Sequence, residues 1–374
     1  MKRSLKAQRL IGIGMQPRDL SAHDEYVAGR GHEEVAAARG IDPSTLITLS
    51  SNENPLGPSP AAVSAIRDYA DKIHRYPKAV HTALTEHIAD HWGVHADQVW
   101  LASGGDGALD YLSRAMLRPG ARILVPSPGF AYYRMSAQFH HAHADTYRAG
   151  ADPTWQLEAE AVLDAYEDHR IVYLTSPHNP TGQSVSIDTI RTIAERTDQE
   201  TLLVVDEAYG EFSETPSAQT LFDEREDVAV LRSFSKAYGL AGVRLGYAIV
   251  PDSWASAYRR INTPFAVNAL ACRAGLAALD DQEHLTSSVD LATWGRSYFH
   301  KNLTAKTWPS EGNFILAAVG DATAVTDALE ARGILVRDCS SFGLPHCIRI
   351  TVGRRSEVRK ATDLCNEILS EATE

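Results

Sequence analysis

Lys236 lies in a segment whose residue types could support covalent chemistry on an aldehyde. It follows the apolar run 228–231, with the hydroxyls of Ser233 and Ser235 just before it and Arg244 after it. A lysine among small and apolar residues can lose its proton and attack an aldehyde as an amine. The hydroxyls and the guanidinium would suit a phosphate group on the same molecule. Pyridoxal phosphate carries both an aldehyde and a phosphate.

A carboxylate ends a second apolar run. Asp206 follows residues 202–205, and Tyr209 comes shortly after it. A carboxylate at the end of a buried strand is costly unless it is paired. A protonated pyridine nitrogen would be a suitable partner and would make the ring an electron sink, while Tyr209 could reach a ring oxygen. A metal-binding Asp-Glu pair is the alternative, which the lack of a preceding P-loop disfavours.

Three further turns follow predicted strands and could bind the same molecule. Gly105 and Asp106 lie in the segment 103–107, where glycines and a helix start could hold an anion. Phe130 could stack on a flat ring, and Asn179, between two prolines, could donate to a ring oxygen. Taken singly, these are also a strand-to-helix turn, a core aromatic and an Asx turn. Their order along the chain favours one shared site, because open α/β sheets bind ligands at the ends of strands.

Alternating helices and strands are predicted to position these groups. Helices are expected over 61–70, 79–92, 107–117, 157–169 and 186–196, and strands over 99–102, 122–125, 171–174, 202–205, 228–231 and 245–250. Several strands are nearly continuous apolar runs, which is typical of a parallel sheet covered on both faces. We therefore expect an α/β domain of three layers.

The pattern changes after about residue 265. Helices are expected over 268–279, 291–305, 322–332 and 357–369, and strands over 314–318, 334–337 and 347–352. This order predicts a smaller α+β domain. We expect residues 1–45 to form an N-terminal arm and part of the small domain, residues 46–265 a large cofactor-binding domain, and residues 266–374 the small C-terminal domain.

Composition excludes several classes of protein. The net charge of −12 over 374 residues disfavours a surface for nucleic acid or anionic membrane. The four cysteines form no CxxC pair, and neither they nor the histidines have the spacing of a metal site. No apolar run approaches the length that spans a membrane, and the apolar stretch near the start is too short for a signal peptide. We expect a cytoplasmic protein without a metal.

The motifs together resemble the class I/II pyridoxal-phosphate aminotransferases of fold type I. The segments that carry the resemblance are SPHNPTG at 176–182, DEAY at 206–209 and SFSK at 233–236, with Arg244. The resemblance implies a mostly parallel central sheet in the large domain. Within this family the chain is most similar to the histidinol-phosphate aminotransferases, through YVAGR at 26–30, SNENPLGP at 51–58, HRYP at 74–77 and LAGVRLG at 240–246.

The resemblance implies a role for each matching residue. Lys236 would form the Schiff base and carry the proton, with Asp206 on the ring nitrogen and Tyr209 at the ring oxygen as further catalytic groups. The other implied cofactor contacts are Asn179 at the ring oxygen, Phe130 against the ring, and Gly105, Asp106, Ser233, Ser235 and Arg244 at the phosphate. Tyr76 would reach the phosphate of the partner subunit's cofactor, which implies a homodimer with shared active sites.

Substrate recognition is also implied by resemblance. Arg349 matches the family's substrate-anion arginine, and Tyr26 and Asn54 are expected to bind substrate beside it. Relatives often carry tyrosine at the position of Phe130 and a proline before the glycine of the 26–30 segment.

The implied reaction transfers the amino group of L-histidinol phosphate to 2-oxoglutarate, giving imidazole-acetol phosphate and L-glutamate in histidine biosynthesis. Three alternatives stay open at this point. They are an aromatic amino-acid aminotransferase, a lyase like threonine-phosphate decarboxylase, and a cofactor-binding relative without catalysis.

Overall fold

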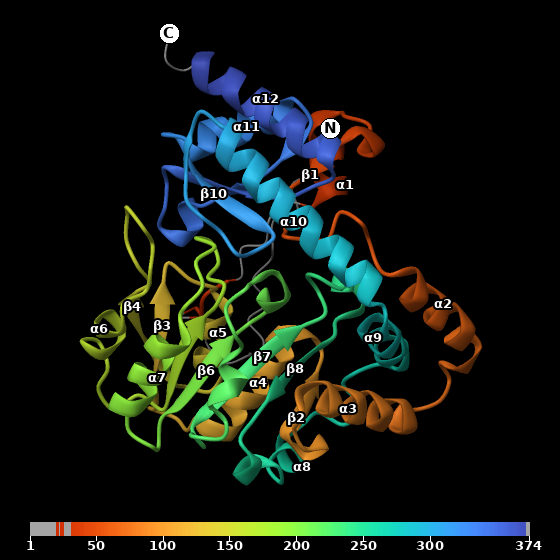
Figure 1. The fold of residues 1–374 in the computed structure, drawn as a ribbon, viewed down its shortest axis with the longest axis vertical. Coiled ribbons are helices and arrows are strands. Elements are labelled where there is room, and N and C mark those ends of the chain that lie inside the picture. Colours follow the sequence, from red (N-terminus) through yellow and green to blue (C-terminus); the bar gives the residue numbers. More distant parts are fainter. Residues whose placement is uncertain (1–19, 22, 26–30, 372–374) are drawn as a thin grey trace, which may run out of the picture.

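A computed structural model describes residues 20–21, 23–25 and 31–371 of the chain (Figure 1). A seven-stranded sheet forms the larger part, with strand order β2-β8-β7-β6-β5-β3-β4. The strands are β2 (Val99–Ala102), β3 (Arg122–Ser127), β4 (His143–Arg148), β5 (Ile171–Thr175), β6 (Leu202–Asp206), β7 (Val228–Ser233) and β8 (Gly246–Ile249). All neighbouring pairs are parallel except those of β8, which runs antiparallel to both β2 and β7.

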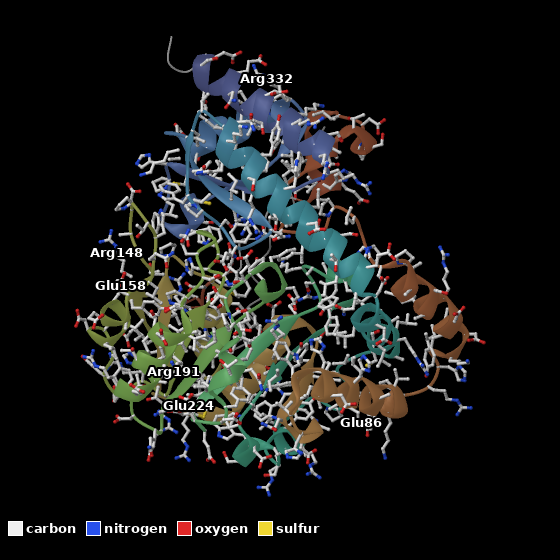
Figure 2. The ribbon with its side chains drawn as sticks, in the orientation of Figure 1. Glu86, Arg148, Glu158, Arg191, Glu224 and Arg332 are labelled. Carbon is white, nitrogen blue, oxygen red and sulfur yellow. The ribbon has the colours of Figure 1, made fainter. Side chains whose placement is uncertain are left out.

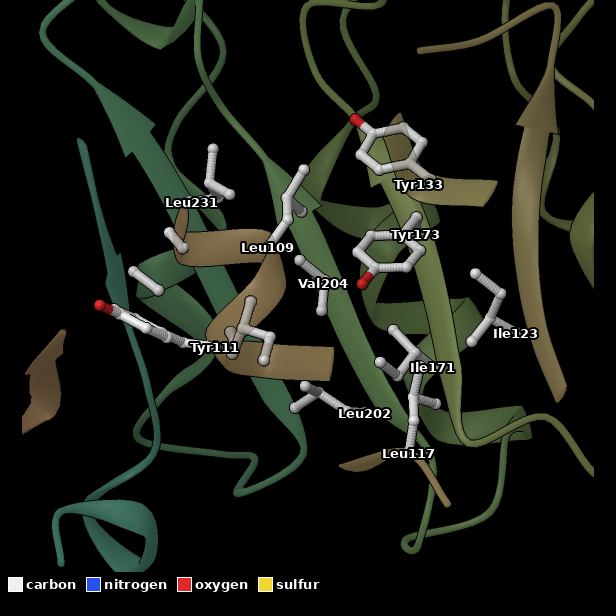
Figure 3. Packing of buried hydrophobic residues seen from close by; sticks show 14 of the residues in the cluster. Leu109, Tyr111, Leu117, Ile123, Tyr133, Ile171, Tyr173, Leu202, Val204 and Leu231 are labelled. Carbon is white, nitrogen blue, oxygen red and sulfur yellow. The ribbon is translucent and has the colours of Figure 1, made fainter. Parts of the chain in front are cut away.

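Both faces of this sheet are covered, because successive residues of each strand point to opposite sides. Leu202 and Val204 of β6 pack with Leu109 of α4 (Gly104–Met116) on one face, beside Tyr133 of α5 (Tyr132–Phe139) (Figure 3). The opposite face is covered by α6 (Ala159–Leu163), α7 (Ile187–Arg196), α2 (Pro60–Tyr69), α3 (Lys78–Trp92) and α9 (Ala269–Asp280). The predicted three-layer α/β fold is confirmed.

A four-stranded antiparallel sheet forms the smaller part, with strand order β12-β13-β10-β9. Its strands are β9 (Lys306–Thr307), β10 (Phe314–Ala318), β12 (Arg337–Asp338) and β13 (Cys347–Thr351), and its helices are α10 (Gln282–Asn302), α11 (Ala322–Ala331) and α12 (Arg355–Glu371). In Figure 1 it lies above the larger sheet. Phe299, Leu329 and Ile348 form part of its own buried core.

The start of the described chain packs on this smaller part. Strand β1 (Ile47–Thr48) pairs in parallel with β11 (Ile334–Leu335). Val35 of α1 (His32–Arg39) packs in a cluster with Leu335. Because α9 packs on α2 and α3, its contacts join it to the larger part. The predicted division into 1–45, 46–265 and 266–374 stays a prediction.

The charged side chains labelled in Figure 2 lie on the outside of both parts. Figure 2 shows Arg191 of α7 near Glu224, and their Nε and Oε2 atoms lie 3.2 Å apart. Arg332, at the end of α11, reaches Glu371 of α12 at 3.1 Å. Among the described residues, no helix is long and apolar enough to cross a membrane.

Several predicted elements differ from the observed ones. The helix expected over 157–169 is only α6, because Glu167 and Asp168 beyond it turn to the guanidinium of Arg122. The helix expected over 291–305 begins earlier, at α10, where the Asp281 side chain accepts from the His284 amide. The strand expected over 334–337 is two strands, β11 and β12, which pair with different partners. Strand β4 was not predicted, because it is a polar, partly exposed edge strand. The short helix α5 before it was not predicted either.

Candidate active site

A cavity of about 430 Å³ opens where β5, β6 and β7 end. The predicted residues that line it are Gly105, Asp106, Phe130, Asn179, Asp206, Tyr209, Ser233, Ser235, Lys236 and Arg244. They come from loops far apart in sequence, which the parallel strands deliver to one edge of the sheet. The structure therefore brings together all ten residues expected at the ring and phosphate of the cofactor within one chain.

Asp206 lies on the wall of this cavity at the end of β6. Its Oδ2 accepts a 2.6 Å hydrogen bond from the Tyr133 hydroxyl, and its Oδ1 accepts from the Ala208 amide at 3.0 Å. Burial raises the pKa of Asp206 from 3.8 to about 6, against the lowering effect of the Tyr133 hydrogen bond. A buried carboxylate of this kind is stabilised by a cationic partner, and a protonated ring nitrogen would be one.

The other end of the cavity is suited to an anion. Gly105 stands in the first turn of α4, where free backbone N–H groups and the helix dipole favour negative charge. Ser233 and Ser235 present buried hydroxyls beside Arg244. The Arg244 Nη2 atom lies 3.0 Å from Asp106 Oδ2. These donors would hold a phosphate group at the start of the helix.

Close approach of Arg244 to the helix start requires glycine at position 104. Gly104 has φ +77°, and a Cβ atom there would lie 2.5 Å from Arg244 Nη2. Side chains other than glycine are strained at this φ and would displace the guanidinium.

Lys236 reaches the cavity between these two ends. Its Nζ donates to the backbone oxygen of Ser51 at 3.3 Å and lies 5.6 Å from the centre of the Tyr209 ring. The Tyr209 hydroxyl accepts from the Asn52 amide at 2.9 Å. Phe130 lies edge-on to Tyr133, with ring centroids 5.6 Å apart. The amine, the phenol and the apolar ring are thus arranged around one space.

A second cavity of about 310 Å³ adjoins the first and shares Phe130, Asn179 and Lys236 with it. Arg349 lines it, only 6 % exposed, and donates from Nη1 to Asn179 Oδ1 and from Nη2 to the Ser50 oxygen, both at 2.6 Å. The predicted substrate arginine therefore sits beside the predicted cofactor site.

Two further arginines that were not predicted line this outer cavity: Arg134, which pairs with Asp24 at 3.4 Å, and Arg337. Arg337 of β12 is the direct cross-strand partner of Arg349 on β13, and both line the cavity. Like charges directly opposite each other destabilise an antiparallel pair. An anion bound between the two guanidiniums would remove that cost. Arg337 lies in the predicted strand 334–337, but nothing in the sequence alone shows that it faces Arg349.

Two predicted site residues, Tyr76 and Asn54, do not line either cavity of this chain. Tyr76 is 78 % exposed and stacks on Phe265, with ring centroids 4.4 Å apart. The Asn54 amide donates to the Ala237 oxygen and the Ser288 hydroxyl, both at 2.8 Å. Asn54 therefore supports the residue next to the lysine, and its predicted contact with substrate stays a prediction. Tyr26 lies outside the described residues.

The residues present fit pyridoxal phosphate. An amine, a buried carboxylate and an anion cradle line one cavity, and the carboxylate has a raised pKa that a pyridinium would offset. Tyr133, which bonds Asp206, was missed because its helix was not predicted. Within the described part of the chain, no group of three or more His, Cys, Asp or Glu side chains could hold a metal ion.

Comparison with known proteins agrees with this geometry. The family described as aminotransferase class I and II matches residues 44–364. The chain is 60 % identical over 357 residues to a histidinol-phosphate aminotransferase of Haloarcula marismortui, covering 96 % of this chain and 99 % of that one. It is 59 % identical over 364 residues to the enzyme of the same name from Halobacterium salinarum, covering 95 % and 99 %.

Solved structures show the same fold. A histidinol-phosphate aminotransferase of Sinorhizobium meliloti, in complex with pyridoxal-5'-phosphate, aligns with a TM-score of 0.83 at 26 % identity. The alignment covers 95 % of this chain and 100 % of that chain. With the family match spanning most of its length, the chain belongs to the class I and II aminotransferases.

Proposed function

We propose that this protein transfers the amino group of L-histidinol phosphate to 2-oxoglutarate, with pyridoxal phosphate as its cofactor, in histidine biosynthesis. The observation that carries the proposal is the cross-strand arginine pair, Arg337 and Arg349, in the cavity next to Lys236. Two guanidiniums match a phosphate dianion better than they match an aromatic side chain. Relatives with this activity in their name, at 59–60 % identity over nearly the whole chain, support the same substrate.

The residues of the chain divide the chemistry among themselves. Pyridoxal phosphate, when bound, supplies a conjugated ring that accepts the electron pair left on the substrate's α-carbon. With the cofactor bound, Lys236 Nζ would be the base that takes the substrate's α-proton and the acid that returns it on the cofactor side. Asp206 would hold negative charge against the ring nitrogen, and the Tyr209 hydroxyl would orient the ring oxygen. Arg349 binds the substrate phosphate in one half-reaction and a carboxylate of 2-oxoglutarate in the other, because its planar fork suits both anions.

A substrate panel tests the proposal. The holoenzyme is mixed with L-histidinol phosphate, L-histidinol, phenylalanine, tyrosine or threonine phosphate, and conversion of the cofactor to pyridoxamine phosphate is followed without 2-oxoglutarate. We expect histidinol phosphate to have the largest kcat/KM, at least tenfold above histidinol, because one charge-assisted hydrogen bond contributes about 1.5–3 kcal/mol. A preference for phenylalanine or tyrosine would overturn the substrate assignment. Carbon dioxide release from threonine phosphate without pyridoxamine phosphate would indicate a lyase.

We also propose a homodimer in which Tyr76 completes the partner's phosphate site. Tyr76, Ile73 and Phe265 are large apolar or aromatic side chains with more than half of their surface exposed, and exposed apolar groups of this kind mark interaction surfaces. The Tyr76 ring stacks on Phe265 and does not line the cavity of its own chain. The four cysteines are all free and buried, which supports a reducing, cytoplasmic location.

Subunit mixing tests the shared site. The variants Tyr76→Ala and Lys236→Ala are each expected to have little activity alone. After mixed refolding, each heterodimer has one site with both residues if Tyr76 acts across the interface, so about a quarter of wild-type activity should return. No recovery from a mixture that sediments as dimers would contradict the shared site. A wild-type protein that sediments as a monomer would contradict the dimer itself.

A further inference from the structure

A chain of two hydroxyls ends on the Asp206 carboxylate in the buried layer beside the cavity. The Tyr133 hydroxyl lies 2.6 Å from Asp206 Oδ2 and 2.9 Å from Thr175 Oγ1. Tyr133 comes from α5, whereas Thr175 and Asp206 are cross-strand partners at the ends of β5 and β6. Side chains from three elements therefore meet at the Tyr133 hydroxyl, and all three side chains are buried.

The direction of these hydrogen bonds follows from the number of protons available. The Tyr133 hydroxyl has one proton and the ionised carboxylate has none, so Tyr133 donates to Asp206. Thr175 must then donate to the Tyr133 oxygen. Burial and the negative charge of Asp206 raise the pKa of Tyr133 well above its ordinary value, so it stays a donor. Hydrogen bonds that point the same way polarise and strengthen one another.

The Tyr133 ring is fixed in this position. It stacks on Tyr173 with ring centroids 4.7 Å apart, and Phe130 meets it edge-on. Figure 3 shows the Tyr133 and Tyr173 hydroxyls at opposite ends of the stack. The Tyr173 hydroxyl faces Ser113 Oγ at 3.4 Å. Because the Ala208 amide holds the second oxygen of Asp206, the carboxylate is restrained at both oxygens.

Two acidic and two basic side chains lie around Asp206. Asp106 of α4 and the adjacent Glu207 both raise the pKa of Asp206, in addition to burial. Lys236 and Arg244 line the same cavity from the loops after β7. The Tyr133 hydrogen bond lowers the pKa of Asp206, so it opposes the two neighbouring carboxylates.

We propose that the Thr175–Tyr133 hydroxyl chain is a positioning device for Asp206, which keeps this carboxylate ionised and aimed at the cofactor's ring nitrogen. The proton between the two groups then stays on the nitrogen, where it is needed to draw electrons from the substrate. This inference rests on the proposed cofactor but not on the identity of the amino donor. Tyr133 and Thr175 act through Asp206 and are not themselves catalytic residues.

The first test uses the apoenzyme and involves no catalysis. Aspartate carboxyl carbons are labelled with ¹³C, and the Asp206 signal is identified by its loss in Asp206→Asn. We expect its titration midpoint to move to higher pH in Tyr133→Phe and, by a smaller step, in Thr175→Val. The matched control is Tyr173→Phe, which removes the hydroxyl of the stacked ring and should leave the midpoint unchanged. An unchanged midpoint in Tyr133→Phe, or an equal shift in the control, would overturn the proposal.

The second test uses the holoenzyme with ¹⁵N in the cofactor's ring. In Tyr133→Phe the nitrogen resonance should move toward that of a neutral pyridine, and the cofactor's Kd should rise about ten- to a hundredfold, as for the loss of a hydrogen bond to a charged group. Neither change is expected in Tyr173→Phe. A wild-type protein that does not bind the cofactor would contradict the proposed function. Normal cofactor binding with an unaltered nitrogen resonance in Tyr133→Phe would contradict only the positioning role of the hydroxyl chain.

Discussion

Replacing Asp206 with asparagine should stabilise the apoenzyme at neutral pH while removing its function. Burial raises the pKa of Asp206 from 3.8 to about 6. For a group that binds its proton more tightly in the folded protein, a stability penalty develops as the pH rises from the unfolded-state pKa to the folded-state pKa, and the full penalty applies above the folded-state pKa. At 1.36 kcal/mol per pH unit, the penalty is about 3 kcal/mol at pH 7 and about half of that at pH 5. It disappears as the pH falls below 3.8.

The loss of one hydrogen bond in Asp206→Asn offsets part of this gain in stability. The two carboxylate oxygens accept from Tyr133 and Ala208, whereas an asparagine side chain has a single acceptor oxygen. One lost hydrogen bond costs about 1 kcal/mol. The net stabilisation of the variant is therefore about 2 kcal/mol at pH 7 and well under 1 kcal/mol at pH 5.

Thermal unfolding of the apoenzymes measures this difference. An unfolding entropy of about 2.1 cal/mol/K per residue gives about 0.8 kcal/mol/K for 374 residues. Asp206→Asn should thus raise Tm by about 2–3 °C at pH 7 and by less than about 1 °C at pH 5. The control Asp223→Asn makes the same change at an exposed position and should leave Tm unchanged at both pH values.

Saturating pyridoxal phosphate should reverse the order, because a ligand stabilises the protein that binds it more tightly. The wild-type holoenzyme is expected to melt above the Asp206→Asn holoprotein, although its apoenzyme melts below. Two results would contradict a destabilising Asp206 carboxylate in the apoenzyme. One is an Asp206→Asn apoprotein that melts below wild type at pH 7, and the other is a Tm difference that does not depend on pH.

Two further substitutions have expected outcomes. Arg349→Lys keeps the charge but not the planar fork, so kcat/KM for histidinol phosphate should fall about ten- to a hundredfold. The control Arg354→Lys makes the same change at an exposed position and should leave kcat/KM unchanged. An unchanged kcat/KM in Arg349→Lys would exclude Arg349 from the anion site. Arg232→Met leaves the buried carboxylates of Glu207 and Glu211, which Arg232 bonds at 2.7 and 2.8 Å, without their counter-charge. Tm should fall by about 5 °C, from a loss of about 3–5 kcal/mol. Replacing both glutamates with glutamine in the Arg232→Met variant should restore most of the lost Tm. An unrestored Tm would show that the loss of stability is not electrostatic.

The parts of the fold that could be predicted from sequence are those with strong periodicity. Strands β5, β6 and β7 each begin with four apolar residues and are buried along their whole length, because both faces of the sheet are covered. Asn179, Asp206 and Lys236 lie at or just after the ends of these strands. The family predicted from these motifs is confirmed by the family match. Edge strand β4 has no apolar run, so its polar sequence, with the short helix before it, gave no comparable signal.

The missed site residues depend on packing between distant segments. Tyr133 meets Asp206 across 73 positions of sequence, and its role follows from a contact that no local pattern encodes. Arg337 becomes informative only when its register opposite Arg349 is known. The proposed role of Tyr76 involves a second subunit, so neither the sequence pattern nor a single chain tests it.

Covalent trapping tests directly whether Lys236 is the amine that binds the cofactor. The holoenzyme is reduced with borohydride, which fixes a lysine-bound cofactor as a stable secondary amine, and the digested protein is mapped by tandem mass spectrometry. We expect the pyridoxyl phosphate mass on Lys236, and we expect Lys236→Ala to carry no label and to have no transaminase activity. A label on another lysine, or full activity in Lys236→Ala, would contradict this role of Lys236.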